Sequence, residues 1–162
     1  MPYSPVPPRR NDDDLLIRVE SEVEAPIQTV FEVIEDLELF AAIEPSTTTV
    51  TYTSEIHRGR GVRSRWTMRD PDTDEIWEAD EEIVHYDKPH QYAYTGHSRG
   101  RDYAGVHTLT ENPDGTTHHE FNEVFHFAAE PAAYRQTIEK MVANAKQLAE
   151  RRHRRPGDGH SL

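Results

Sequence analysis

Two glutamates stand where a strand pattern would bury them, and carboxylates in such positions can do acid–base chemistry. Glu81 and Glu123 each alternate with apolar residues in segments that read as half-buried strands. Burial without a partner cation raises a carboxyl pKa, which would suit proton abstraction or the dehydration of an aldol adduct. We therefore take both as candidate catalytic residues. A register shifted by one residue would instead place both carboxylates in solvent.

His107 and His119 are two further candidate catalytic residues, because histidine titrates near neutral pH. The chain has 10 histidines, so either one could instead be a hydrogen-bonded residue of the core or the surface. With His118 and His126 they could also suggest a metal site. The chain lacks the His-Glu-x-x-His spacing, however, and adjacent strand residues point to opposite faces. No metal and no cofactor are expected.

Apolar and aromatic residues on the same strand faces, and on one face of a helix, are expected to bind a hydrophobic ligand. A lining of this kind with a few polar groups suits a flat, oxygenated molecule. Tyr103 could add a hydrogen bond to a ligand oxygen. The candidate ligand-binding residues on strands are Trp66, Met68, Trp77, Ile83, Tyr92, Tyr94, Leu109, Phe121 and Phe125. Those on the helix are Tyr134, Ile138, Met141 and Val142.

Three arginines alternate with this apolar row on one strand, at positions 63, 65 and 69. They could anchor a ligand carboxylate or enolate through paired hydrogen bonds. The interpretation favoured here is that they form a solvated outer face opposite the acidic segment 78–82.

Alternation and turn residues predict the elements that position these side chains. Two short helices are expected after the first strand, one beginning at Ala25-Pro26 and one from Asp36 to Ala42. A loop is expected at 98–102, and Pro131 begins a long amphipathic helix. Strands followed by a helix predict an α+β fold with an antiparallel sheet. The expected strands cover residues 15–23, 47–57, 62–69, 75–86, 90–97, 104–111 and 116–127.

Length and composition bound the function classes. The 162 residues predict one domain at 14–152, with a disordered lead-in at 1–13 and a disordered tail at 153–162. The net charge of -12 argues against a nucleic-acid partner, and the chain has no cysteine for disulfides or thiolate sites. No apolar run is long enough for a membrane span and no signal peptide is recognisable, so a cytoplasmic location is expected.

Five short segments carry a family resemblance. They are Val23–Asp36 (strand, Ala-Pro, helix, Asp), Glu44-Pro45-Ser46, Gly59-Arg60-Gly61, Tyr86–Pro89 and Asn112–Thr116. In this order the chain resembles the START and birch-pollen-allergen-like superfamily, in its polyketide cyclase and dehydratase branch, over roughly 15–152. One departure is that Ala41-Ala42-Ile43 stands where family members carry an aromatic residue.

The resemblance implies a helix-grip fold: a curved antiparallel sheet of about six to seven strands wrapped around the long C-terminal helix. It also implies an internal cavity for a hydrophobic or aromatic small molecule. Three functions remain open on the sequence alone. They are a polyketide cyclase, aromatase or dehydratase, a non-catalytic carrier of a lipid, quinone or aromatic metabolite, and a protein-interaction module. A monomer or a homodimer is expected.

Overall fold

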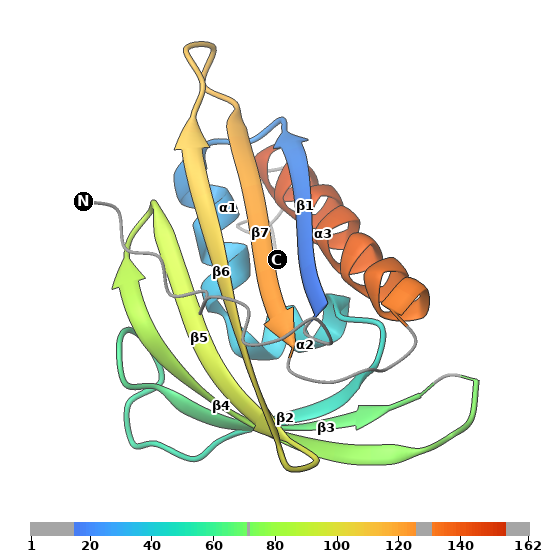
Figure 1. Cartoon of the computed structure of the whole chain (residues 1–162). Coiled ribbons are helices and arrows are strands. Elements are labelled where there is room, and N and C mark those ends of the chain that lie inside the picture. Colours follow the sequence, from blue (N-terminus) through green and yellow to red (C-terminus); the bar gives the residue numbers. More distant parts are fainter. Residues whose placement is uncertain (1–14, 71, 126–130, 155–162) are drawn as a thin grey trace, which may run out of the picture.

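An antiparallel sheet of seven strands forms the body of the protein within the residues that the computed structural model describes, 15–70, 72–125 and 131–154. The strand order is β1-β7-β6-β5-β4-β3-β2 (Figure 1). The strands are β1 (Leu15–Val23), β2 (Thr47–Tyr52), β3 (Arg63–Arg69), β4 (Ile76–Asp87), β5 (Gln91–Ser98), β6 (Arg101–Glu111) and β7 (Thr117–Phe125).

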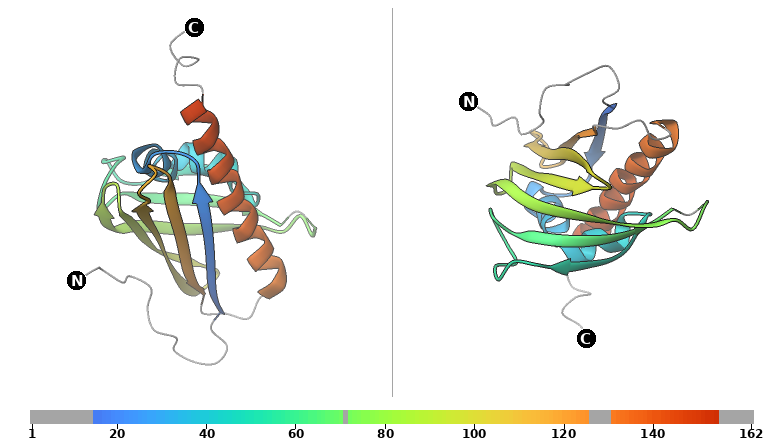
Figure 2. Two further views of the ribbon diagram at one scale, coloured as in Figure 1. Left: turned by 90° about the horizontal axis from the view of Figure 1, so that it is seen from above. Right: turned by 60° about the horizontal axis from the view of Figure 1, so that its bottom comes forward.

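The helices of the described chain lie on one side of this sheet (Figures 1 and 2). The short helices α1 (Ile27–Glu35) and α2 (Leu37–Ile43) follow β1, and the long helix α3 (Pro131–Arg154) follows β7. Helix α3 packs against β1 and α1. The sheet is curved, since β1, β7 and β6 stand upright in Figure 1 while β4, β3 and β2 run across its lower part. This confirms the predicted α+β helix-grip fold.

Local sequence explains where the short helices begin and where one hairpin turns. Pro26 directly precedes α1, as predicted. The Asp36 carboxylate accepts the backbone N–H of Leu39 at 3.1 Å and so caps the N-terminus of α2. In the β6–β7 turn, Gly115 has a φ of 85° and donates its N–H to the carbonyl of Asn112 at 3.0 Å. Glycine adopts this left-handed conformation without steric cost.

The strand predicted at 47–57 is shorter than expected and ends at Tyr52. The side chain of Ser54 accounts for the difference, because its hydroxyl takes part in the backbone hydrogen bonding beyond that point. It accepts the N–H of Arg63 at 2.8 Å and donates to the carbonyl of Ile56 at 2.7 Å. Serine hydroxyls that bond to nearby backbone compete with a strand ladder in this way.

The loop predicted at 98–102 is wrong: the connection is a two-residue turn. Arg99 and Gly100 have φ angles of 51° and 75°. Positive φ at both central residues is typical of the type I′ turn, whose twist matches that of the flanking strands. As a result, β5 continues to Ser98 and β6 begins at Arg101.

The chain ends differ in part from the expectation. Helix α3 continues through Arg154, past the domain boundary expected at 152. The lead-in predicted at 1–13 and the rest of the predicted tail, 155–162, lie outside the described residues. Among the described helices, none is long and apolar enough to cross a membrane.

The two faces of the sheet follow the predicted alternation. On β3, Ser64 and Trp66 are buried against the helices, whereas Arg63 and Arg65 are exposed. Arg65 forms an ion pair with Asp80 of β4 at 2.9 Å. The arginine row thus forms the solvated outer face opposite acidic residues, and the concave inner face forms the core.

Candidate functional site

Glu123 lies on the concave face and bonds to tyrosines of two different elements. Its carboxylate accepts hydrogen bonds from the hydroxyls of Tyr94 on β5 and Tyr134 on α3, and only 3% of its surface is exposed. It lies opposite Gly105, where a Cβ atom would meet the Tyr94 hydroxyl oxygen at 2.5 Å. Because glycine has no side chain, Gly105 leaves space for the Tyr94 hydroxyl to reach the Glu123 carboxylate.

Glu81 is arranged in a similar way but is only half-buried. It lies opposite Gly96 and accepts a hydrogen bond of 2.7 Å from the hydroxyl of Tyr103. A Cβ atom at Gly96 would meet the Tyr103 ring at 2.1 Å, so no other residue fits there without moving that ring. The rings of Tyr103 and Tyr94 are in edge contact, with centroids 6.2 Å apart, and this contact links the two carboxylates.

Burial holds both carboxyl groups near neutral pKa values. Desolvation raises the pKa of Glu81 to about 8, with the charge of Glu123 adding to the effect. Desolvation raises the pKa of Glu123 to about 7, although the bonds from Tyr134 and Tyr94 lower it. Within the described residues no cationic side chain pairs with either group, and the nearby Glu44 disfavours ionisation of both. Each carboxyl can therefore exchange a proton near neutral pH.

His107 and His119 form a buried pair on neighbouring strands. The Nδ1 of His107 lies 2.9 Å from the Nε2 of His119, and the two rings stack at an interplanar angle of 20°. Both side chains are at most 2% exposed. Burial lowers the pKa of His107 well below its usual value and that of His119 to about 4. Both imidazoles are therefore neutral at physiological pH.

The pair is enclosed by aromatic rings. Phe121 lies 4.5 Å from the His107 ring between centroids, and Tyr92 and Phe40 lie at 6.2 and 5.8 Å. Phe40 comes from α2 and was not among the predicted residues. The sequence shows apolar residues along α2 around Phe40. It does not show which strand they cover, because that depends on how the helix docks.

The other predicted binding residues divide by burial. Met68 and Tyr134 are only partly buried against the core. Trp77 is half-buried near the start of β4, where the guanidinium of Arg99 lies over its ring at 4.4 Å. For Phe125, only its place at the end of β7 is described. Those within the concave core are Trp66, Ile83, Tyr92, Tyr94, Leu109, Phe121, Ile138, Met141 and Val142.

Another carboxylate of the interior, Glu35, was missed. It accepts hydrogen bonds from the hydroxyl of Tyr86 and from Lys88 Nζ at 3.0 Å, and Arg58 pairs with it at 3.3 Å. Its position four residues after Phe31 places it on the buried face of α1. This helical spacing could have predicted its burial from the sequence. The ion pair with Lys88 joins α1 to the β4–β5 turn. Because two cations neutralise Glu35, it differs from Glu81 and Glu123, which have no cationic partner among the described residues.

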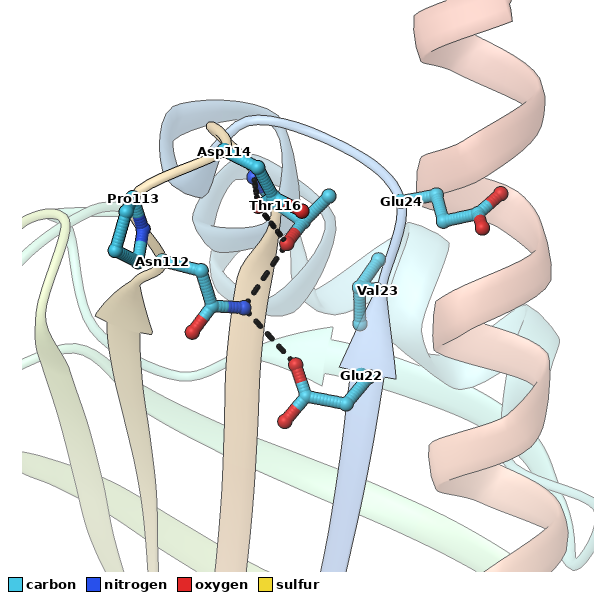
Figure 3. A pocket seen from close by; sticks show the side chains of 7 residues that line it. All are labelled: Glu22, Val23, Glu24, Asn112, Pro113, Asp114 and Thr116. Carbon is cyan, nitrogen blue, oxygen red and sulfur yellow. Dashed lines mark hydrogen bonds between the residues drawn. The ribbon is translucent and has the colours of Figure 1, made fainter.

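Two hollows open on the surface away from the histidine pair. One, of about 590 Å³, lies between the end of β1 and the β6–β7 turn (Figure 3). Its polar groups bond to one another, since Asn112 Nδ2 donates to Glu22 and to Thr116 at 2.9 Å each. The other, of about 680 Å³, is lined mainly by outward-facing residues of β3–β6, including the ion-paired Arg65 and Asp80. No group of three metal-ligating side chains occurs in the described chain.

Comparison with known proteins identifies the fold and a matching family. The family model for polyketide cyclase / dehydrase and lipid transport proteins matches residues 15–151. No curated protein matches the sequence.

Solved structures match over most of their length at low identity. Ara h 8.0201 is 14% identical with a TM-score of 0.66, and the match covers 84% of this chain and 97% of that one. Major latex-like protein 151 of Panax ginseng is 9% identical with a TM-score of 0.67, covering 84% and 97%. A protein of Chromobacterium violaceum is 14% identical with a TM-score of 0.68, covering 84% and 98%. At these identities the likeness establishes the fold alone.

Proposed function

The chain belongs to the polyketide cyclase / dehydrase and lipid transport family of the START-like superfamily, and on this premise we propose that it binds a hydrophobic aromatic small molecule on the concave face of its sheet. We further propose that Glu81 and Glu123 move protons on that molecule. The observation that carries the proposal is the Glu81–Tyr103 pair, a half-buried carboxyl with a pKa raised to about 8 on a face that is built mainly from apolar and aromatic side chains.

The two carboxyl groups suit the loss of water from a β-hydroxy ketone. In this step a base removes the proton on the carbon beside the carbonyl, a carbon–carbon double bond forms, and the carbon–oxygen bond to the hydroxyl breaks. An acid protonates the departing hydroxyl, which leaves as water. With pKa values of about 7 and 8, both carboxyl groups exchange protons near neutral pH, and Glu123 ionises more readily than Glu81. On this order of ionisation we assign Glu123 the role of the base and Glu81 that of the acid.

A non-catalytic carrier is the second candidate, and the apolar interior favours it. Trp66, Tyr92 and Phe121 are each at most 5% exposed and offer an aromatic surface without charge. A lipid, quinone or aromatic metabolite would be held there by burial of its apolar area. In that case the two glutamates would tune affinity without turning over the ligand.

Native mass spectrometry of the freshly purified protein, with a panel of aromatic polyketides, quinones and fatty acids, tests binding first. Every compound that binds is then incubated with the protein and followed for loss of water. Glu81→Gln and Glu123→Gln are expected to keep binding and lose turnover. Glu82→Gln is the matched control, because Glu82 is the exposed neighbour on the same strand.

The outcomes separate the candidates. Turnover that disappears in the two inner variants and persists in Glu82→Gln supports the enzyme. Binding without turnover of any compound supports the carrier. Failure of the whole panel to bind would contradict ligand binding and would favour a protein-interaction module instead.

A further inference from the structure

The His107–His119 pair leaves two buried ring nitrogens without partners in the part of the chain that the structure describes. One nitrogen of each ring is used in the mutual hydrogen bond of 2.9 Å. The second nitrogen of each ring, Nε2 of His107 and Nδ1 of His119, has no hydrogen-bond partner among the described residues. Both side chains are 98% or more buried, so bulk water does not solvate these nitrogens. A buried polar atom without a hydrogen bond costs folding free energy, so a ligand atom that forms this bond would be bound favourably.

The chemistry of a neutral imidazole pair determines what these nitrogens offer. Each neutral ring carries one N–H and one lone pair. If His107 donates in the shared bond, its outer nitrogen is an acceptor and the outer nitrogen of His119 is a donor. If His119 donates, the two outer roles are exchanged. In either tautomer the pair therefore presents one unpaired donor and one unpaired acceptor.

The surroundings of the pair restrict which ligand groups can form hydrogen bonds with the two outer nitrogens. The rings of Phe121, Tyr92 and Phe40 enclose His107, and within the described residues neither histidine forms a hydrogen bond with a carboxylate or a cation. The titratable groups facing His107 and His119 are each other, the exposed-side His118 and Tyr92, whose buried phenol has a pKa raised well above its usual value and so carries no charge. A charged ligand group would lose its hydration here without gaining an opposite charge. A neutral oxygen would gain a hydrogen bond.

We propose that the His107–His119 pair is the recognition site for a neutral hydroxyl or carbonyl oxygen on the aromatic ligand. This proposal rests on the proposed function, since it assumes that a ligand enters the concave face. The exchange of tautomers lets the pair donate to a carbonyl or accept from a phenol without a change of net charge. The ligand class is thus a neutral oxygenated aromatic, in preference to a hydrocarbon or a carboxylate.

Phenol and toluene test this directly, because they have nearly the same shape and differ in one hydroxyl. The full-length ¹⁵N-labelled protein is titrated with each probe at pH 7.5, and the imidazole nitrogens are followed by long-range ¹H–¹⁵N NMR. Phenol is expected to shift an outer nitrogen resonance of His107 or His119, whereas toluene is expected to leave both in place. In His119→Phe, the preference for phenol over toluene should fall about 5- to 10-fold, which corresponds to one lost hydrogen bond.

Phe121→Leu is the control variant, because Phe121 contacts His107 without a polar group. It is expected to change the affinities for both probes by the same factor. Equal binding of phenol and toluene with unmoved imidazole resonances would overturn the recognition site and leave hydrophobic binding intact. Failure of both probes to bind would overturn both proposals. If His119→Phe does not fold, the nitrogen shifts of the wild-type protein decide the question.

Discussion

Tyr134 of α3 donates its hydroxyl hydrogen to the carboxylate of Glu123 on β7, so the long helix is joined to the sheet at a titratable group. Because the carboxylate also accepts from Tyr94, helix and strand share one proton-exchanging centre. The affinity of a ligand that binds Glu123 would therefore also depend on the position of α3.

Tyr134→Phe removes one of the two hydrogen bonds that favour the ionised form of Glu123. The pKa of Glu123 is therefore expected to rise above its value of about 7. The loss of one buried hydrogen bond should cost about 1 kcal/mol of folding stability. Titration of the Glu123 carboxyl carbon by ¹³C NMR measures the shift, and an unchanged or lower pKa would show that the bond does not form in solution.

Glu81→Gln should stabilise the protein more at high pH than at low pH. Burial raises the folded-state pKa of Glu81 from 4.5 to about 8, so its ionisation costs stability as the pH rises through this window. Glutamine does not ionise, so the free energy of unfolding of the variant relative to wild type should increase between pH 5 and pH 9 by roughly 1–3 kcal/mol. The increase is limited to this size because Glu81 retains some contact with water. Urea unfolding at several pH values measures this. Glu82→Gln should show no such trend.

The histidine pair predicts the opposite dependence at acid pH. Burial lowers the folded-state pKa of His119 from 6.5 to about 4, so the unfolded chain binds protons more readily in that interval. Stability contributed by the neutral pair is present above pH 6.5 and is lost as the pH falls towards 4. His119→Gln should flatten this decline in urea titrations, and a decline of equal steepness would mean that other groups cause it.

Trp66→Ala should destabilise the protein by about 3–5 kcal/mol, because truncating a buried tryptophan leaves a large cavity. Trp66 is 5% exposed, contacts Phe40 and donates its indole N–H to the Ser64 hydroxyl at 2.9 Å. It should also weaken ligand binding. Ser64→Ala removes only the hydrogen bond and should cost much less. A stable Trp66→Ala protein would contradict the buried position.

Gly96→Ala should displace the Tyr103 ring and break its hydrogen bond to Glu81. The added Cβ would lie 2.1 Å from that ring, much closer than atoms can approach. Since the bond from Tyr103 lowers the pKa of Glu81, its loss should raise this pKa further, as measured by NMR titration. Gly100→Ala is a useful comparison, because no atom lies near its Cβ position and only the left-handed backbone is strained. A Glu81 titration that is identical in wild type and Gly96→Ala would refute the role of the glycine.

The sequence by itself determined which residues share a strand face, and hydrophobicity predicted which face is buried. Side chains two residues apart point the same way, so alternation predicted Glu81, His107 and Glu123 on the apolar face, with a register shifted by one residue as the alternative. The order of elements and the segment Val23–Asp36 supported the superfamily resemblance, which the family match confirms. The loop predicted at 98–102 was wrong because the two-residue turn needs positive φ at both Arg99 and Gly100, and an arginine does not favour this left-handed conformation.

Only the tertiary structure decided which of these groups meet. Tyr94 and Glu123 are far apart in the chain, and their contact depends on strand order, register and the small residue Gly105 between them. Glu35 and Lys88 likewise meet only because α1 docks beside the β4–β5 turn. Local patterns carry the direction of each side chain, but the identity of its partner arises from long-range pairing, which no local pattern encodes.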